Sequence, residues 1–194
     1  MKKEVLRSAL KTSLIIVGVI WVVYIADLLI PYNFNHSGIV PRSVNGLKGI
    51  FLSPFIHASF FHIISNTLPL LVLSFLLFAF YPKQAWFVIL LSIVLGGIAV
   101  WLVARPAAHV GASGLIYALA AFLVTAGFLA RSFTTLIVSI LVVLLYGGLV
   151  WGVFPSRPWV SWEGHLFGAA AGILLAFLLK KNIQKETREK NKRG

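Results

Sequence analysis

The sequence predicts an all-α membrane protein with six transmembrane helices, on three observations. Hydrophobic residues make up 59% of the 194 residues and charged residues 11%, whereas a soluble domain is typically about 45–50% apolar and about 25% charged. Six apolar segments reach the roughly 20 residues that a spanning helix needs. Short breaks marked by proline, glycine or charge separate most of them. The segments cover about residues 12–31, 58–80, 85–104, 113–130, 133–154 and 163–180.

The first segment, 12–31, follows a basic N-terminal tail of residues 1–11. A signal peptide has the same order of basic and apolar stretches. This apolar stretch is long for a signal peptide, however, and no convincing small-x-small cleavage site follows it. We therefore interpret it as an uncleaved membrane anchor. Asp27, near its outer end, is interpreted as an interfacial residue.

The longest break, from Pro31 to about Ser53, is predicted to be an amphipathic first outer loop. Its polar residues are mixed with apolar ones that let it lie on the membrane surface. These apolar residues are Leu47, Ile50, Phe51 and Leu52. No internal repeat stands out, so residues 12–180 are predicted to form one membrane domain. The basic C-terminal tail, 181–194, is interpreted as a stop-transfer signal and lipid anchor.

The distribution of lysine and arginine predicts that both termini are cytoplasmic. With the N-terminus inside, the inner segments hold Lys2, Lys3, Arg7, Lys11, Lys83, Arg131, Lys180, Lys181, Lys185, Arg188, Lys190, Lys192 and Arg193. The outer segments hold only Arg42, Lys48, Arg105 and Arg157. In this orientation Ser113 and the histidines lie in outer loops or at outer helix ends. The histidines are His36, His57, His62, His109 and His165.

Composition also excludes several classes of site. The chain has no cysteine, which excludes disulfide bonds, thiolate metal sites and cysteine nucleophiles. The net charge of +12 is compatible with nucleic-acid binding, but most basic residues lie in the two tails beside apolar runs. In that position they meet anionic lipid headgroups. We therefore expect contact with the lipid bilayer and no nucleic-acid partner.

Two polar residues that open apolar segments are the leading candidates for chemistry. Ser113 lies in Gly-Ala-Ser-Gly and His165 in Gly-His. A serine hydroxyl becomes a nucleophile when a neighbouring imidazole takes its proton. The first amides of a helix that starts near Ser113 lack intrahelical partners and can hold an oxyanion. Each residue also has a plainer explanation, as a helix N-cap and as an interhelical hydrogen bonder.

Small residues predict close packing between the fourth and sixth segments. At helical spacing they share a face with His165 or with Ser113. They are Gly168, Gly172, Gly114, Ala118 and Ala121. Two such faces let backbones approach, which would bring Ser113 and His165 within hydrogen-bond reach. Tyr117, one turn beyond Ser113, is expected to pack on the imidazole. Ordinary helix packing would explain these residues equally well.

A third element lies at the outer end of the second segment, where His62 and Asn66 share one helical face. Their N–H groups are the kind of donor that completes an oxyanion hole, although both could instead satisfy loop carbonyls. No carboxylate suits a third triad position, because Glu163 precedes His165 too closely to orient it from the same turn. The sequence therefore predicts a Ser–His dyad.

These three motifs in this order resemble those of rhomboid intramembrane proteases, over about residues 45–180. The resemblance implies a rhomboid-like helix bundle. It implies roles for six residues: Ser113 as nucleophile, His165 as general base, Asn66 and His62 as oxyanion donors, Gly111 lining the same pocket, and Tyr117 stacked on the base. One departure is Leu47-Lys48-Gly49, where many members carry Trp-Arg, and it concerns the local structure of the first outer loop.

The resemblance also implies an activity: hydrolysis of peptide bonds in or near transmembrane segments of other proteins, without metal or cofactor. A notch open to the outer face would admit water, and small or helix-breaking residues would let a substrate helix unwind there. Gly147 and Gly148 in the fifth segment are compatible with a mobile gate. The simple six-helix plan predicts a prokaryotic plasma membrane.

Three other functions stay open at this point: a metalloprotease, an inactive relative that binds membrane proteins, and a small transporter or channel. The sequence has no His-Glu-x-x-His motif, retains both dyad residues, and has helix centres nearly free of charge. The physiological substrate and the oligomeric state are not predicted.

Overall fold

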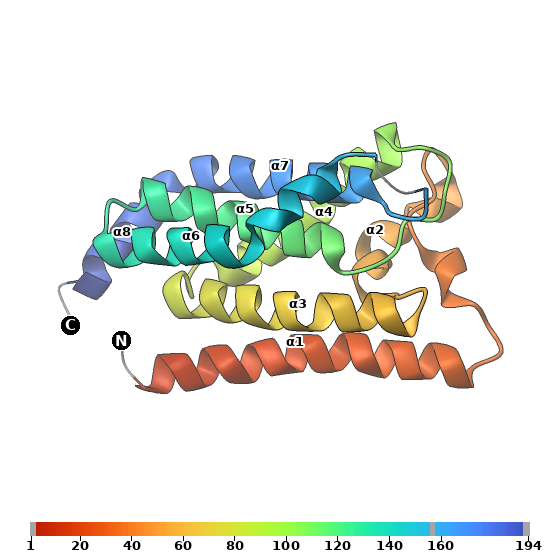
Figure 1. The fold of residues 1–194 in the computed structure, drawn as a ribbon, viewed down its shortest axis with the longest axis horizontal. Coiled ribbons are helices and arrows are strands. Elements are labelled where there is room, and N and C mark those ends of the chain that lie inside the picture. The colour runs from red at the N-terminus through yellow and green to blue at the C-terminus, as the bar shows by residue number, and fades with distance from the viewer. Residues whose placement is uncertain (1–2, 156–157, 192–194) are drawn as a thin grey trace.

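The computed structural model describes residues 3–155 and 158–191. Within them the helices run roughly side by side around a central helix, α5 (Ser113–Leu129), as Figure 1 shows. α5 packs against α3 (Phe60–Phe80), α6 (Phe133–Tyr146) and α7 (Trp162–Leu178). Its most deeply buried side chains include Leu119, Phe122 and Leu123. α5 is apolar on nearly every side, as expected of a helix surrounded by other helices or by lipid.

The all-helical class is confirmed, and each predicted segment contains a helix. α1 (Lys3–Leu29) begins inside the predicted basic tail, because residues 3–11 are mostly good helix formers. α3, α4 (Ala85–Val103), α5 and α7 lie close to their predicted limits. The fifth segment divides into α6 and a 3₁₀ helix, η4 (Gly147–Val153), where a Gly-Gly pair weakens the α-helix.

Four helical stretches in the described part of the chain are long and apolar enough to cross a membrane. They are α1, α3, α4, and α6 together with η4. A fifth results if α7 and the helix after it are counted as one bent span. α5 is also apolar but has only 17 residues. At 1.5 Å per residue it is about 26 Å long, slightly less than the hydrocarbon thickness of about 30 Å.

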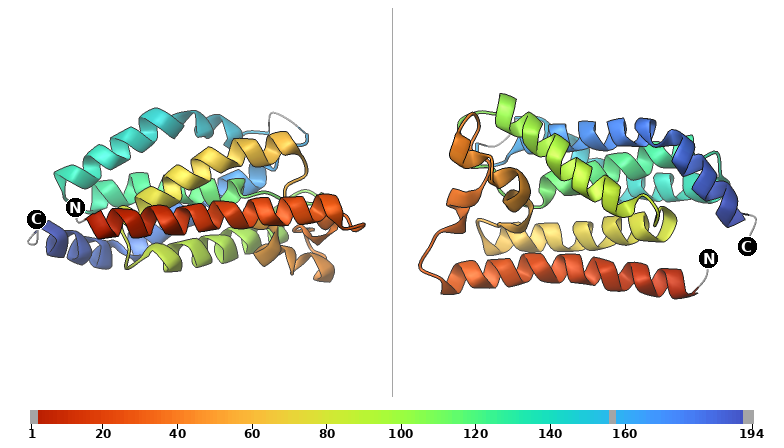
Figure 2. Two further views of the ribbon diagram at one scale, coloured as in Figure 1. Left: turned by 90° about the horizontal axis from the view of Figure 1, so that it is seen from below. Right: turned by 180° about the vertical axis from the view of Figure 1, so that it is seen from behind.

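α1 lies along one side of the bundle and packs mainly on α3 (Figure 2). In the part of the chain described, one side-chain hydrogen bond joins α1 to α3. Trp21 Nε1–H donates to Thr67 Oγ1 at 3.1 Å. Most of its other large side chains are exposed, among them Leu14, Ile15, Val22, Ile25 and Leu28. An exposed apolar surface of this kind is favourable in contact with lipid and unfavourable in contact with water.

Glycines set the distance between α5 and α7. A Cβ at Gly168 would lie 2.1 Å from the Gly114 carbonyl oxygen, and a Cβ at Gly172 would lie 2.1 Å from that of Ala118. No larger residue fits at either position unless the backbones separate. The two helices therefore touch backbone to backbone, as small-residue stripes allow.

The first loop is ordered and is attached to the end of α4. It contains η1 (Phe34–Ser37), η2 (Val44–Gly46), α2 (Gly49–Leu52) and η3 (Ser53–Phe55). Ile50 is buried against Gly97 of α4, while Leu47, Phe51 and Leu52 are exposed. The loop thus has one face packed on protein and one apolar face outside.

Polar contacts hold this loop in place. Arg42 Nη1 donates to the carbonyls of Leu102 and Ala104 at 3.2 and 2.9 Å, which satisfies carbonyls at the C-terminus of α4. Trp101 Nε1–H donates to the Ser43 carbonyl at 2.8 Å. Arg42 of the loop and Trp101 of α4 therefore anchor the loop to the end of α4. Leu47-Lys48-Gly49, which differs from the Trp-Arg of many rhomboid members, takes no part in these contacts. Asp27 accepts the Phe34 backbone N–H at 2.8 Å and fixes the turn after α1.

The basic C-terminal segment folds as α8 (Lys180–Asn191), which bends 67° from α7. One face is buried against the bundle, with Ile183 fully enclosed and Glu186 2% exposed. Lys190 Nζ donates to the last two backbone carbonyls of α3, at 3.0 and 2.7 Å. The other face leaves Lys181, Lys185 and Arg188 exposed. The segment predicted as a tail is therefore a docked amphipathic helix.

The bundle has two distinct ends. The first turn of α1 and the last turn of α8 lie at one end, and the first loop and the start of α5 lie at the other (Figure 1). We call them the terminal end and the site end. Lys2, Arg157, Lys192 and Arg193, which contribute to the predicted charge asymmetry, lie outside the described residues.

Replacing Gly172 with alanine is expected to destabilise the bundle, because the added Cβ meets a rigid backbone carbonyl on α5. Overpacking of this kind costs about 1–3 kcal/mol. The thermal unfolding midpoint in mild detergent measures the effect.

The matched control is Gly18→Ala in α1, where nothing lies within 4 Å of an added Cβ. Removing that helical glycine is expected to leave the midpoint unchanged or raise it slightly. Equal midpoints for the two variants would contradict a close α5–α7 contact.

Candidate active site

Two helix starts bring Ser113 and His165 together at the site end. Ser113 is the first residue of α5, and His165 lies in the first turn of α7. Ser113 Oγ and His165 Nε2 are 2.9 Å apart, and residue His165 is 9% exposed. Ala112, not Ser113, occupies the N-cap position of α5. The serine hydroxyl therefore pairs with the imidazole and does not cap its own helix.

The opposite nitrogen of His165 is held by a backbone carbonyl. Nδ1 lies 2.9 Å from the Gly152 oxygen in η4. A carbonyl only accepts, so Nδ1 carries the proton, and Nε2 presents a lone pair to the Ser113 hydroxyl. Sequence reasoning missed Gly152, since a contribution from a main-chain oxygen leaves no mark on residue type.

Tyr117 lies flat against His165, with ring centroids 4.2 Å apart and planes 5° apart. A Cβ at Gly152 would lie in the same space, 1.8 Å from the Tyr117 hydroxyl oxygen and 3.2 Å from His165 Nδ1. The Tyr117 ring covers one face of the imidazole, and the Gly152 backbone lies beside it at a position that has no room for a side chain. Together they hold the imidazole in one orientation.

Gly111 brings the backbone before Ser113 close to α3. Its φ of +114° lies in a region that favours glycine, and a Cβ there would lie 2.5 Å from His62 Nε2 and 3.6 Å from Asn66 Nδ2. The Asn66 amide nitrogen is buried and has no hydrogen-bond partner within the described chain. An unpaired buried donor is costly, so its presence beside a candidate nucleophile needs an explanation. Accepting an oxyanion would supply the missing partner.

His57 is a second residue that sequence reasoning did not assign to the site. Its Nε2 accepts the Ala112 backbone N–H at 3.4 Å, and its ring packs edge-on against that of His62, with centroids 5.0 Å apart. Burial, with a smaller contribution from His62, lowers the pKa of His57 to about 4. The ring is therefore neutral at pH 7 and supports the turn that leads to Ser113. Its position just before the His-x-x-x-Asn motif was the one available signal.

A cavity of about 50 Å³ adjoins Ser113. Its lining includes four polar side chains, which belong to Ser53, Ser92, His109 and Ser161. Ser92 Oγ is buried and lacks a hydrogen-bond partner in the part of the chain described. A single water needs roughly 10–15 Å³, so the space is sufficient for one.

Glu163 is not a hydrogen-bond partner of His165 in the described part of the chain. Its carboxylate Oε1 lies 3.4 Å from Arg105 Nε, and no hydrogen bond joins it to the imidazole within the described residues. Within those residues no group of three or more His, Cys, Asp or Glu side chains is arranged to hold a metal ion. The arrangement as a whole offers a hydroxyl, an oriented neutral base and an unpaired donor around one point.

Comparison with known proteins identifies the family of this chain. The Rhomboid domain matches residues 45–182, which span the region from the first loop into α8. The chain is 36% identical over 178 residues to an uncharacterised protein of Mycobacterium tuberculosis, covering 87% of this chain and 74% of the relative. An uncharacterised Mycobacterium leprae protein is 34% identical over 177 residues, covering 87% and 70%. The resemblance seen in the motifs is confirmed, and the chain belongs to the rhomboid family of intramembrane serine proteases.

Proposed function

We propose that this chain is an intramembrane serine endopeptidase with Ser113 as nucleophile and His165 as general base. The observation that carries the proposal is the 2.9 Å contact between Ser113 Oγ and His165 Nε2, with Nδ1 held by the Gly152 carbonyl. Family membership supports the same activity. The dyad contains no carboxylate, and the Gly152 carbonyl replaces the third group of a triad as the orienting acceptor.

Acylation begins when Ser113 Oγ bonds to the substrate carbonyl carbon and its proton passes to His165 Nε2. The tetrahedral intermediate collapses as its C–N bond breaks, and the imidazolium returns the proton to the leaving amine. Water then attacks the acyl carbon while His165 again takes a proton. Expulsion of Ser113 Oγ, which is reprotonated, releases the new carboxyl terminus and restores the enzyme.

The negative charge of each tetrahedral intermediate falls on the former carbonyl oxygen. We assign its stabilisation to Asn66 Nδ2, the His62 ring N–H and the Ser113 backbone N–H. Asn66 is the strongest of these candidates, since its buried amide nitrogen has no partner within the described chain. Gly111 contributes by having no side chain, because a Cβ would meet His62 at 2.5 Å.

Deacylation requires water inside an otherwise apolar bundle. The 50 Å³ cavity beside Ser113 is lined by hydroxyl and imidazole groups that can bind it. Substrate backbone must also reach Ser113, and helical backbone is already hydrogen-bonded internally. We therefore expect cleavage where small or helix-breaking residues allow a transmembrane substrate to unwind.

We further propose six spans, with both termini in the cytoplasm and the site end toward the extracytoplasmic side of a cell membrane. The charge asymmetry supports this orientation, with most basic residues at the terminal end. The ordered first loop supports it as well, since its exposed apolar face suits the membrane surface. A prokaryotic plasma membrane is the proposed location.

Labelling with a fluorophosphonate probe tests the dyad directly. Purified wild type in detergent is expected to form a covalent adduct at Ser113, located by mass spectrometry. Ser113→Ala is expected to abolish it, and His165→Ala to slow it by about 10²–10⁴-fold, the usual contribution of a general base. An adduct that persists in Ser113→Ala would place the nucleophile elsewhere. Absence of labelling in folded wild type would favour a binding protein without catalytic activity.

Asn66→Ala is expected to slow fluorophosphonate labelling by about 10²-fold, since the phosphonyl oxygen occupies the same position as the oxyanion. Removing one oxyanion donor typically costs about 10²–10³-fold. Ser65→Ala is the matched control, because Ser65 is exposed and its hydroxyl donates to the His62 carbonyl. A labelling rate in Asn66→Ala equal to that of the control would remove Asn66 from the proposed oxyanion hole.

Lateral access is assigned to the site-end half of the fifth span. Ser139 Oγ reaches the Leu123 and Val124 carbonyls of α5 at 3.0 Å each, which fixes the terminal-end half of α6. Beyond Tyr146 the chain passes into η4, whose Val150 and Trp151 are exposed. Because Gly152 lies in η4, opening also loosens the contact that orients His165 until the segment closes again.

Valine at both Gly147 and Gly148 is expected to stiffen this segment. An added Cβ meets only Val143 at 3.8 Å in one case and nothing within 4 Å in the other, so the Cβ of each new side chain has room. Cleavage of a quenched-fluorescent transmembrane peptide should fall several-fold, while fluorophosphonate labelling stays at the wild-type rate. Unchanged cleavage and substrate preference would count against this gate.

A further inference from the structure

Both proposed catalytic side chains lie in the first turn of a helix, where the helix itself provides little restraint. The first amides of a helix have no intrahelical acceptor, and helix ends fray. α5 has no side-chain cap at its N-terminus. The Ser113–His165 distance therefore depends on what holds the segment before α5 against the segment before α7.

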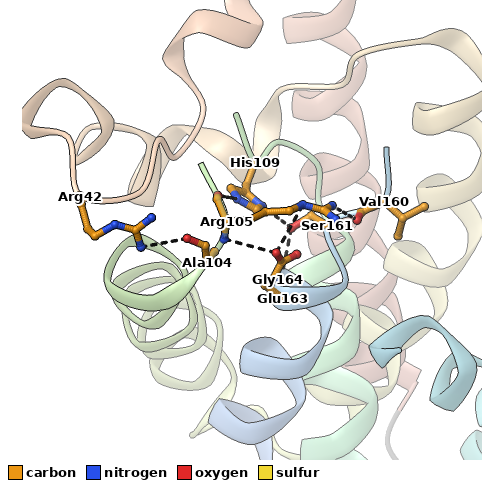
Figure 3. A network of polar contacts seen from close by, with 8 residues as sticks. All are labelled: Arg42, Ala104, Arg105, His109, Val160, Ser161, Glu163 and Gly164. Atoms are coloured by element: carbon orange, nitrogen blue, oxygen red, sulfur yellow. Dashed lines mark hydrogen bonds and ion pairs between the residues drawn. The ribbon is translucent and has the colours of Figure 1, made fainter. Parts of the chain in front are cut away.

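A second histidine–serine pair joins these two segments. His109 precedes Ser113 by four residues, and Ser161 precedes His165 by four residues. His109 Nδ1 and Ser161 Oγ are 2.7 Å apart, and His109 is 5% exposed (Figure 3). This contact spans the same two segments as the dyad and lies beside it, on the wall of the cavity that Ser113 lines.

The proton positions in this pair follow from its other partners. His109 Nε2 lies 3.1 Å from the Arg105 carbonyl, which only accepts, so Nε2 carries the proton. Nδ1 therefore accepts the Ser161 hydroxyl proton. Ser161 Oγ in turn accepts the Gly164 backbone N–H at 3.3 Å and caps α7. One hydroxyl thus connects the first turn of the base helix to the segment that carries the nucleophile.

Arg105 and Glu163 reinforce the same connection. The Arg105 guanidinium donates to the Val160 carbonyl and lies 3.4 Å from the Glu163 carboxylate (Figure 3). Glu163 is 3% exposed but the Arg105 side chain is 34% exposed, so water screens this ion pair in part. On the opposite side, His109 exchanges two backbone hydrogen bonds with Ile39 of the first loop, at 3.0 and 2.9 Å. His109 is therefore held at both its main chain and its ring.

We propose that the His109–Ser161 hydrogen bond is a positioning contact that sets the spacing of Ser113 and His165. The inference rests on the proposed function. Neither residue touches the reacting atoms, so both act through the dyad. Contacts that hold a catalytic group in position matter because a displacement of about 1 Å in such a group can cost about 10²-fold in rate.

The test measures the second-order rate of Ser113 labelling by a fluorophosphonate, which needs no transmembrane substrate. Ser161→Ala and His109→Leu are each expected to slow labelling by about 10- to 100-fold. His109→Leu leaves the cap serine in place, so it separates the pairing from helix capping. The double variant is expected to be no slower than the slower single variant, because both substitutions break one contact.

Two further variants distinguish a loss of positioning from a general loss of stability. His109→Gln retains one donor and one acceptor and is expected to recover part of the rate. Ser139→Ala removes a buried hydroxyl at the terminal end of the α5–α6 contact and is expected to label within about twofold of wild type, with a lowered unfolding midpoint.

Three results would overturn the inference while leaving the proposed function intact: wild-type labelling rates in both single variants, multiplicative effects in the double variant, or equal slowing in Ser139→Ala. Attachment of the probe to Ser161 instead of Ser113 would overturn both. A folded wild type that does not label at all would overturn the proposed function and this inference with it.

Discussion

The direct backbone contact between α5 and α7 is the constraint on which the rest of the site depends. Gly168 and Gly172 meet the carbonyls of Gly114 and Ala118, and a Cβ at either glycine would lie 2.1 Å from oxygen. In a membrane, helices associate by such packing because lipid is as apolar as their side chains. The short separation of the helices brings their first turns, and the two polar residues on them, within reach of one hydrogen bond.

Main-chain carbonyls perform much of the orientation that carboxylates perform in other serine hydrolases. Gly152 fixes the tautomer of His165, and Arg105 fixes that of His109. A neutral acceptor suits apolar surroundings, since a buried carboxylate carries a desolvation cost unless it is paired. Glu163, a buried carboxylate at this end, is paired with Arg105. At the candidate site, Glu163 is thus used to pair with Arg105, while the Gly152 carbonyl orients His165.

The two ends of the bundle differ in their chemistry. Imidazoles, hydroxyls and the unpaired Asn66 amide gather at the site end, where helix starts and the first loop meet. At the terminal end, α8 covers the helix ends, and Lys190 satisfies carbonyls of α3 that would otherwise lack partners. The terminal end is therefore closed by a docked helix, whereas the candidate site lies at the opposite end of the bundle.

Local pattern in the sequence was sufficient for the all-helical class and for the positions of the main helices. Apolar length marked each segment, and the small residues of the fourth and sixth segments indicated which helices meet. Only the tertiary structure decided how the imidazoles are oriented, because Gly152 and Arg105 act through main-chain oxygens that residue type does not reveal. It also decided that residues 180–191 dock as a helix and that Arg42 and Trp101 together hold the first loop. The contacts of Arg42 and Trp101 join residues about 60 positions apart, and their geometry depends on how the helices pack.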